Sequence, residues 1–262
     1  MDHFTKEKNI IEFFQLEDST SIFFPVFNSE LRLLFSSIYK KKNWKKWIDS
    51  SSKNAPPPDF YNKDLQIMMD VMRIDDHEYI SAKGKVVNEQ RKIESQAIAQ
   101  IRKSDQYKEL KEPIIFADIF TDLPTDEDHN FGRYKECFWR TIENHKKKIP
   151  NYQKNHPGYK VIFFVFDESS AYCETTEKFS GTMKKGMSFE GRPHVQFLDK
   201  EFLKVVENSE IDYLIWYTPY KKIDFDSKGN FFDLPKAAFY SRSAMNFDYL
   251  TYDYNRIISV EE

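Results

Sequence analysis

Two acidic residues, Asp59 and Asp70, stand in a pattern that suits the binding of a divalent metal ion. Asp59 follows a proline, and Asp70 lies within the mostly apolar run 65–74. If that run is a strand, successive side chains alternate between faces, so Asp70 shares a face with Met72. An acid on such a strand is costly to bury unless it is paired or binds a metal. Two converging carboxylates would supply the hard oxygen ligands that Mg²⁺ or Mn²⁺ prefers.

This arrangement resembles the PD-(D/E)XK phosphodiesterase superfamily, whose motif is Pro-Asp followed, after a variable gap, by Asp/Glu-x-Lys on the next strand. Pro58-Asp59 and Asp70 match the motif. The resemblance covers about residues 28–113. It implies a nuclease-like protein that cleaves DNA or RNA phosphodiesters, with Mg²⁺ or Mn²⁺ held by Asp59 and Asp70. It also implies a further metal ligand on the preceding helix, for which Glu30 is the candidate.

The chain departs from the motif at Met72, which stands where the lysine is expected. In metal-dependent phosphodiesterases that lysine orients the attacking water and neutralises charge on the phosphoryl oxygens. Methionine can do neither, so Arg73 is the first candidate to replace it, followed by Lys63 and Lys92. On a flat strand, however, Arg73 points to the face opposite Asp70. Without a replacement, the same fold would serve as a non-catalytic protein that binds nucleic acid or a protein partner.

Residues 65–74 also fit a second interpretation. Four apolar residues recur at helical spacing, namely Leu65, Met68, Met69 and Met72. Asn62 could cap the helix that they would form. Asp70 would then be an ordinary residue on the flank of an amphipathic helix, and Asp59 a turn acid. Periodicity does not separate a strand from a helix over so short a run.

A basic and aromatic segment at residues 39–47 is the candidate nucleic-acid-binding surface. Its lysines would contact phosphates and its tryptophans would stack on bases, the residues concerned being Lys41, Lys42, Trp44, Lys45 and Lys46. The alternative is a solvated helix whose tryptophans turn inward.

Other candidate groups were weighed against ordinary structural roles. His77 could carry protons near the acid pair, or be a hydrogen-bonded loop residue. The six histidines show no HxxH or HExxH spacing, so the sequence signals no zinc site. A second acidic cluster comprises Asp118, Asp122, Asp126, Asp128, Asp167 and Glu168, with His129 nearby. Such acids at strand ends suit a small-molecule enzyme working at Asp122 and Asp167, or are solvated loop acids.

The composition narrows the class of protein. Of 262 residues, 40% are hydrophobic and 16% aromatic, which excludes a disordered chain. A formal net charge of −3 means that any polyanion must be bound by a local patch. Two cysteines do not make a disulfide framework and favour a cytoplasmic location. The N-terminus lacks a signal-peptide pattern, and the longest apolar run, 161–166, is too short to span a membrane.

Alternating helices and strands predict an α/β protein with a mixed central β-sheet flanked by helices, as a restriction-endonuclease-like core with extra strands. We expect a single domain, 1–262, with a nuclease-like core at about 28–120 and a C-terminal extension of the sheet at about 130–262. Residues 169–193 are expected to form a long polar loop, either a lid or a hairpin. Helices are predicted at 28–47, 88–103, 133–148 and 199–208, and strands at 21–27, 59–74, 113–120, 160–167, 194–198 and 211–217.

Overall fold

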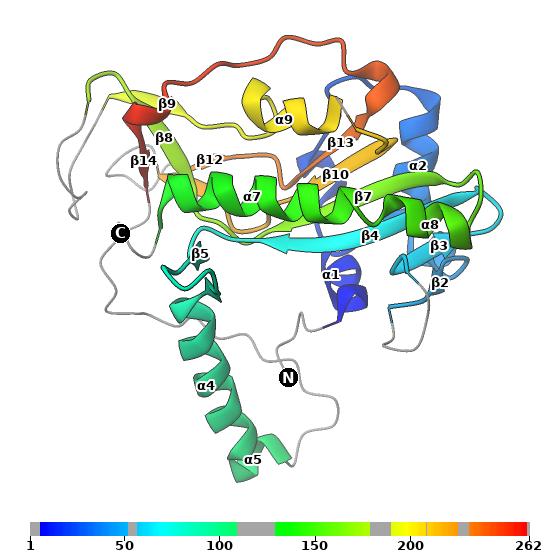
Figure 1. The fold of residues 1–262 in the computed structure, drawn as a ribbon, viewed down its shortest axis with the longest axis horizontal. Helices are drawn as coiled ribbons and strands as arrows, with labels where there is room; N and C mark the ends of the chain where they lie inside the picture. Colours follow the sequence, from blue (N-terminus) through cyan, green and yellow to red (C-terminus); the bar gives the residue numbers. More distant parts are fainter. Residues whose placement is uncertain are drawn as a thin grey trace.

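A mixed β-sheet of seven strands runs through the part of the chain that the computed structural model describes, which is residues 6–51, 57–108, 129–178, 190–207, 209–224 and 231–260 (Figure 1). Strands β4, β7 and β10 are parallel to one another, whereas β3 and β13 run antiparallel to their inner neighbours. The predicted α/β class with a mixed sheet is therefore confirmed. In spatial order the strands are β1 (Ile22–Phe23), β13 (Ala237–Ser241), β10 (Tyr213–Tyr217), β7 (Lys160–Asp167), β4 (Ile67–Ile74), β3 (Phe60–Asn62) and β2 (Ile48–Asp49).

Helices cover both faces of this sheet. One face, which we call the α7 face, packs against α7 (Phe131–Lys146), α8 (Ile149–Asn155) and α9 (Lys200–Glu207). The opposite face, the α2 face, packs against α1 (Glu7–Phe14) and α2 (Ser29–Tyr39). Each layer has its own apolar core, so the sheet separates two sets of buried side chains. Groups on the two faces can therefore meet only around the ends and edges of the sheet, as Glu30 of α2 and Glu207 of α9 do in lining one hollow.

Strand β4 shows why residues 67–74 form a strand and not an amphipathic helix. Its neighbours β3 and β7 pair with it on both sides. Met68 and Met72 join the core of the α7 face, whereas Met69 and Val71 join that of the α2 face. A strand buried on both faces needs a nearly continuous apolar run, which mimics helical spacing by chance. Asp70 is the acidic exception on the α7 face.

Asparagine caps start three of the predicted helices. The side chains of Asn28, Asn88 and Asn130 accept hydrogen bonds from backbone N–H groups three residues later, at 2.8, 2.8 and 3.0 Å. The helix predicted at 28–47 divides into α2 and the short α3 (Lys41–Trp44). The second cap opens α4 (Glu89–Lys103), which is followed by α5 (Asp105–Lys108) and projects away from the sheet (Figure 1).

Several short strands lie outside the main sheet. Residues 169–193 contain β8 (Tyr172–Thr175) and β9 (Gly191–Pro193), which pair with each other, and β14 (Ile257–Ser259) pairs with β8. The hairpin alternative for this segment therefore holds at its two ends, and residues 179–189 lie outside the described residues. Two further hairpins are β5 (Tyr79–Ile80) with β6 (Val86–Val87), and β11 (Lys222–Asp224) with β12 (Phe231–Asp233).

Two strands predicted from sequence have no counterpart among the described elements. The strand predicted at 194–198 is wrong, because Leu198 N bonds to Val195 O at 2.9 Å and turns the chain into α9. The strand predicted at 113–120 lies outside the described residues. The neighbour of β4 in the sheet is β7, which comes after α7 in the chain. The ranges 28–120 and 130–262 thus contribute neighbouring strands to one sheet. Among the described helices, none is long and apolar enough to cross a membrane.

Candidate metal centre

Asp59 and Asp70 face each other at the point where β3 begins. Phe60 of β3 pairs with Met69 of β4, so the next step along this antiparallel ladder sets Asp59 opposite Asp70. Their carboxyl groups are hydrogen-bonded to each other. Asp59 Oδ2 also accepts a hydrogen bond from Val71 N at 2.8 Å, and so takes the place of a strand partner there. The two acids are therefore close enough to share one ion.

Asp70 has two further partners from the helices that cover the α7 face. Oδ2 accepts a hydrogen bond from the Tyr152 hydroxyl at 2.5 Å and contacts Nδ1 of His145. Neither residue was among the site residues predicted from sequence. A signal was present for His145, which continues the core-facing stripe of α7 from Phe138 and Ile142 at helical spacing. A histidine on an apolar stripe needs a buried partner, and Asp70 is that partner.

The two carboxyl groups titrate as a pair that holds one proton. Burial, together with the negative charge of Asp70, raises the pKa of Asp59 to about 8. For Asp70, burial acts to raise the pKa, but the hydrogen bond and charge of His145, with Tyr152 and Asp59, hold it below its ordinary value. Near neutral pH the pair therefore carries one negative charge. The proton is bound to Asp59 and forms the hydrogen bond to Asp70.

The His145 end of this site is partly open to solvent and is followed in the chain by exposed lysines. The His145 side chain is 20% exposed, although that of Asp70 is only 7% exposed. Lys147 and Lys148, just beyond His145, are exposed at the end of α7. These lysines suit the negative end of the helix dipole and place positive charge two and three residues after His145 in the chain.

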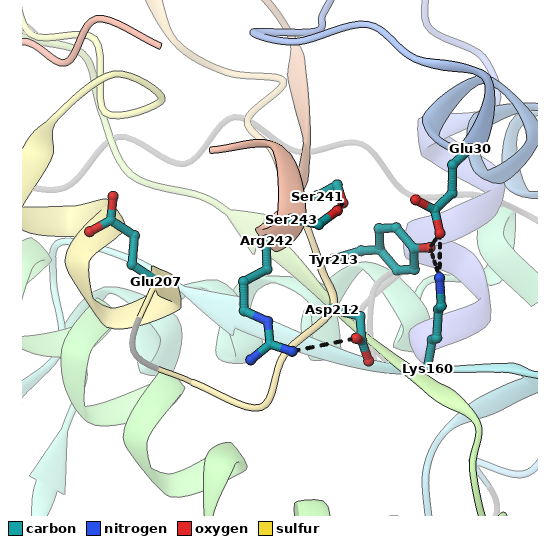
Figure 2. A pocket seen from close by; sticks show the side chains of 8 residues that line it. All are labelled: Glu30, Lys160, Glu207, Asp212, Tyr213, Ser241, Arg242 and Ser243. Atoms are coloured by element: carbon teal, nitrogen blue, oxygen red, sulfur yellow. Dashed lines mark hydrogen bonds and ion pairs between the residues drawn. The ribbon is translucent and has the colours of Figure 1, made fainter. Parts of the chain in front are cut away.

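Glu30 does not join the acid pair. It lies on α2, on the opposite face of the sheet, and contacts Lys160 Nζ and the Tyr213 hydroxyl. These residues line a different hollow of about 430 Å³, in which Arg242 pairs with Asp212 (Figure 2). The hydrogen bond from Lys160 is the main reason that the pKa of Glu30 is lowered. A role for Glu30 as third ligand beside Asp59 and Asp70 is therefore excluded by geometry.

Arg73 also lies away from the pair, as strand alternation predicted. Its Nε and Nη2 donate to the two carboxylate oxygens of Glu168 at 2.7 and 2.6 Å. Met72, at the expected lysine position, is 3% exposed within the core of the α7 face. Lys63 and Lys92 are exposed, and Lys92 pairs with Glu89 on its own helix. His145 is thus the basic side chain that contacts the acid pair, instead of any of the residues proposed from sequence.

The basic and aromatic segment combines both interpretations made from sequence. Trp47 is buried and donates Nε1–H to Ser37 O at 3.1 Å, so it is a packing residue. Trp44 is half-buried between Trp47 and Phe60, with ring centroids 5.4 and 5.1 Å away. It lines a groove of about 520 Å³ together with Lys41 and Lys45. The four lysines of the segment, Lys41, Lys42, Lys45 and Lys46, are all exposed. Lys46 forms an ion pair with Asp64.

Of the second acidic cluster, Asp167 and Glu168 fall within the described residues. Neither is a solvated loop acid. Asp167 is fully buried at the end of β7 and accepts hydrogen bonds from Tyr134 Oη at 2.7 Å and Trp216 Nε1 at 2.8 Å. Lys221 Nζ lies 3.6 Å from the same oxygen. Four acids lie outside the described residues, namely Asp118, Asp122, Asp126 and Asp128, so the site proposed at Asp122 and Asp167 stays a prediction.

His77 follows the carboxyl end of β4 and does not contact the acid pair. Its ring contacts Asp76 instead. From Asp70 to the end of β4 at Ile74 the strand advances about 3.3 Å per residue, which carries the chain away from the pair. The histidine that contacts the acid pair is therefore His145, and His77 lies beside Asp76 instead.

Comparisons of the chain with protein-family models, with curated proteins and with solved structures found no match. The function must therefore be argued from the geometry of the acid pair and its surroundings.

Proposed function

We propose that this chain is a metal-dependent hydrolase that cleaves DNA or RNA phosphodiesters, with Asp59 and Asp70 as ligands of Mg²⁺ or Mn²⁺. The observation that supports it is the acid pair itself: the half-buried carboxyl group of Asp59 and the buried one of Asp70 are in contact and share one proton. Forcing two acids together is unfavourable, and a divalent ion that replaces the proton relieves this. Carboxylate oxygens at this spacing fit the ligand preference of both ions.

Each residue of the site has a distinct part in this proposal. A bound ion would polarise a phosphoryl oxygen and make its water more acidic. Asp59 and Asp70 hold the ion, and the Tyr152 hydroxyl fixes the orientation of Asp70. Because Nδ1 of His145 is occupied by Asp70, Nε2 is the nitrogen that can take up or release a proton. His145 thereby takes over part of the role of the missing lysine.

Binding of the nucleic-acid backbone is assigned to lysines on two surfaces. Lys147 and Lys148 are exposed at the end of α7, just after His145, whereas Lys41 and Lys45 lie with Trp44 along the groove on the α2 side. Phosphates would meet the first surface directly, and a longer strand would pass around the β2–β3 edge to reach the second. Such contacts supply affinity without reading sequence.

A cleavage assay with matched variants tests this function. Plasmid and single-stranded DNA and RNA are incubated with Mg²⁺ or Mn²⁺ and with wild type, Asp59→Asn or Asp70→Asn. Both substitutions keep side-chain size, and Asp64→Asn, an exposed acid in the β3–β4 turn, is the control. We expect cleavage by wild type and the control, and a loss of at least about 100-fold in the two variants, as for loss of a metal ligand. Equal cleavage by all four proteins would contradict the assignment.

A second candidate function is non-catalytic binding of nucleic acid or a protein partner on the same scaffold. The burial of Met72 at the expected lysine position supports it. The two functions differ in one outcome: a binding protein would retain oligonucleotide with no cleavage under any divalent ion. We further propose a reducing, cytoplasmic setting, since Cys137 and Cys173 are both buried free thiols.

A further inference from the structure

A separate group of potential metal ligands lies beyond the carboxyl end of β4. Asp76 and His77 follow that strand, and His129 precedes Asn130, the cap of α7. Each side chain offers one ligand atom, and the three atoms lie within 4.8 Å of one another. Neither acid of the metal centre described above belongs to this group. The carboxyl ends of parallel strands are a common place for bound ligands in α/β proteins.

The two oxygens of Asp76 have very different surroundings. Oδ2 accepts hydrogen bonds from Ser170 N at 2.9 Å, Ser170 Oγ at 2.6 Å and Tyr172 Oη at 2.6 Å. Oδ1 is buried and accepts no hydrogen bond from the described residues. Burial alone would raise the pKa of Asp76, but hydrogen bonds and charges from His129, His77 and Ser170 hold it well below its ordinary value. A buried, ionised oxygen without a donor is costly, unless a cation contacts it.

The two imidazole rings meet at this carboxylate. His77 Nε2 lies 3.4 Å from Asp76 Oδ1, and His129 Nδ1 lies 3.5 Å from Oδ2. Their ring centroids are 5.1 Å apart and the planes are inclined by 58°, so the rings converge without stacking. Ligand atoms held at about 2.0–2.1 Å by a tetrahedral ion are themselves roughly 3.3–3.4 Å apart. The two nitrogen–oxygen spacings are close to those values, each to a different oxygen of Asp76, and the set of one ligand atom from each residue spans no more than 4.8 Å.

We propose that Asp76, His77 and His129 bind a Zn²⁺ ion. Two imidazoles and one carboxylate favour a borderline transition metal over Mg²⁺, which prefers oxygen ligands alone. Three protein ligands leave the fourth position of a tetrahedral ion to water. Solvent can reach it, because the side chains of His77 and His129 are 15% and 17% exposed. The ion joins the end of β4 to the start of α7.

The hydrogen bonds to Oδ2 form the outer support of this site. Ser170 and Tyr172 hold the carboxylate through Oδ2, which lies beside His129, and so place Oδ1 beside His77. Outer hydrogen bonds of this kind commonly orient carboxylate ligands, and their loss weakens metal affinity roughly 10–100-fold. The HxxH spacing that was absent from the sequence is not required, because one histidine reaches the site from the end of a strand and the other from the start of a helix.

Metal titration of the full chain tests the proposal. The protein is freed of metal with a chelator and titrated with Zn²⁺ by calorimetry, and with Co²⁺ as a spectroscopic probe of tetrahedral nitrogen ligation. The variants are His77→Gln, His129→Gln and Tyr172→Phe. The controls are His156→Gln, a histidine outside the site that packs on Tyr61, and Asp59→Asn, which lacks the first metal centre. Circular dichroism and thermal unfolding establish that each variant is folded.

We expect wild type, His156→Gln and Asp59→Asn to bind one Zn²⁺ and to give the intense visible bands of tetrahedral Co²⁺. Each of His77→Gln and His129→Gln should weaken binding by more than about 100-fold, and Tyr172→Phe by roughly 10-fold. Zn²⁺ binding that neither histidine variant alters would overturn the proposal, and so would a wild type without tetrahedral Co²⁺ bands. Because Asp59→Asn retains this site, its outcome is independent of the nuclease assay.

Discussion

Asp59 and Asp70 lie opposite each other across the β3–β4 ladder, and a hydrogen bond joins their carboxyl groups. Such a bond between two acids exists only while one of them keeps its proton. The pair therefore binds one proton, and the two carboxyl groups would repel each other if both were charged. Several measurable properties depend on this.

The first is the pH dependence of stability. Folding raises the pKa of Asp59 from 3.8 to about 8, so between these values the folded state holds a proton that the unfolded chain has lost. The free energy of unfolding due to this group therefore falls as pH rises from about 4 to about 8. Asp59→Asn removes that slope. Urea unfolding measures the free energy of unfolding of both proteins. We expect the value of the variant to rise relative to that of wild type by roughly 1–3 kcal/mol as pH increases from 4 to 9. A constant difference across pH would contradict this, and Asp64→Asn is the control.

The second property is proton release on metal binding. If Mn²⁺ binds between Asp59 and Asp70, it displaces the shared proton, so about one proton per ion should leave at pH 7. Calorimetry in buffers of different ionisation enthalpy measures this number. Asp59→Asn has no such proton, so any residual binding should release none. Equal release from wild type and the variant would place the ion elsewhere.

The Tyr152 hydroxyl is expected to stabilise the charged form of Asp70. Tyr152→Phe deletes a 2.5 Å hydrogen bond to a buried carboxylate, and should lower the free energy of unfolding by about 1–3 kcal/mol at pH 7. The deficit should shrink in acid, where Asp70 becomes protonated. Tyr159→Phe, at a half-buried tyrosine nearby, should change stability by less than about 0.5 kcal/mol. A similar effect of both substitutions would show that the hydrogen bond contributes nothing specific.

Arg73 should act on stability and not on metal binding. Arg73→Gln leaves the carboxylate of Glu168 without its two-point partner, and should destabilise the fold by roughly 3 kcal/mol. Mn²⁺ affinity, measured under folded conditions, should be unchanged. Lys92→Gln, in an exposed ion pair, should cost less than about 0.5 kcal/mol. Loss of Mn²⁺ binding in folded Arg73→Gln would restore the catalytic role that the sequence suggested for this residue.

Nucleic-acid binding should depend on charge at the two lysine surfaces. Binding of a labelled oligonucleotide is measured against salt for Lys41→Glu/Lys45→Glu and for Lys147→Glu/Lys148→Glu. Each lost phosphate contact should reduce the salt slope by about 0.7–0.9. Trp47→Ala is unsuitable as a probe because this buried residue should cost about 3–5 kcal/mol of stability. An unchanged affinity and an unchanged salt slope in both double variants would show that neither surface binds nucleic acid.

Local patterns in the sequence were sufficient for much of the fold. The asparagine caps at 28 and 88, the apolar run 160–167 and the stripe on residues 134–142 all correspond to observed elements. These features depend on neighbours in the chain, whose geometry is fixed by residue type and spacing. The 65–74 run was left between strand and helix, because only pairing with β3 and β7 distinguishes them.

The candidate sites divide in the same way. The sequence by itself singled out Asp59 and Asp70, and its strand interpretation set them on adjoining strands, since a short antiparallel ladder brings together residues that are close in the chain. Only the tertiary structure decided that His145 and Tyr152 complete the pair, that Glu30 lies on the other face, and that Asp76, His77 and His129 meet. Those contacts depend on how helices pack on the two faces of the sheet. That packing is a cooperative result of the whole core, and no local spacing encodes it.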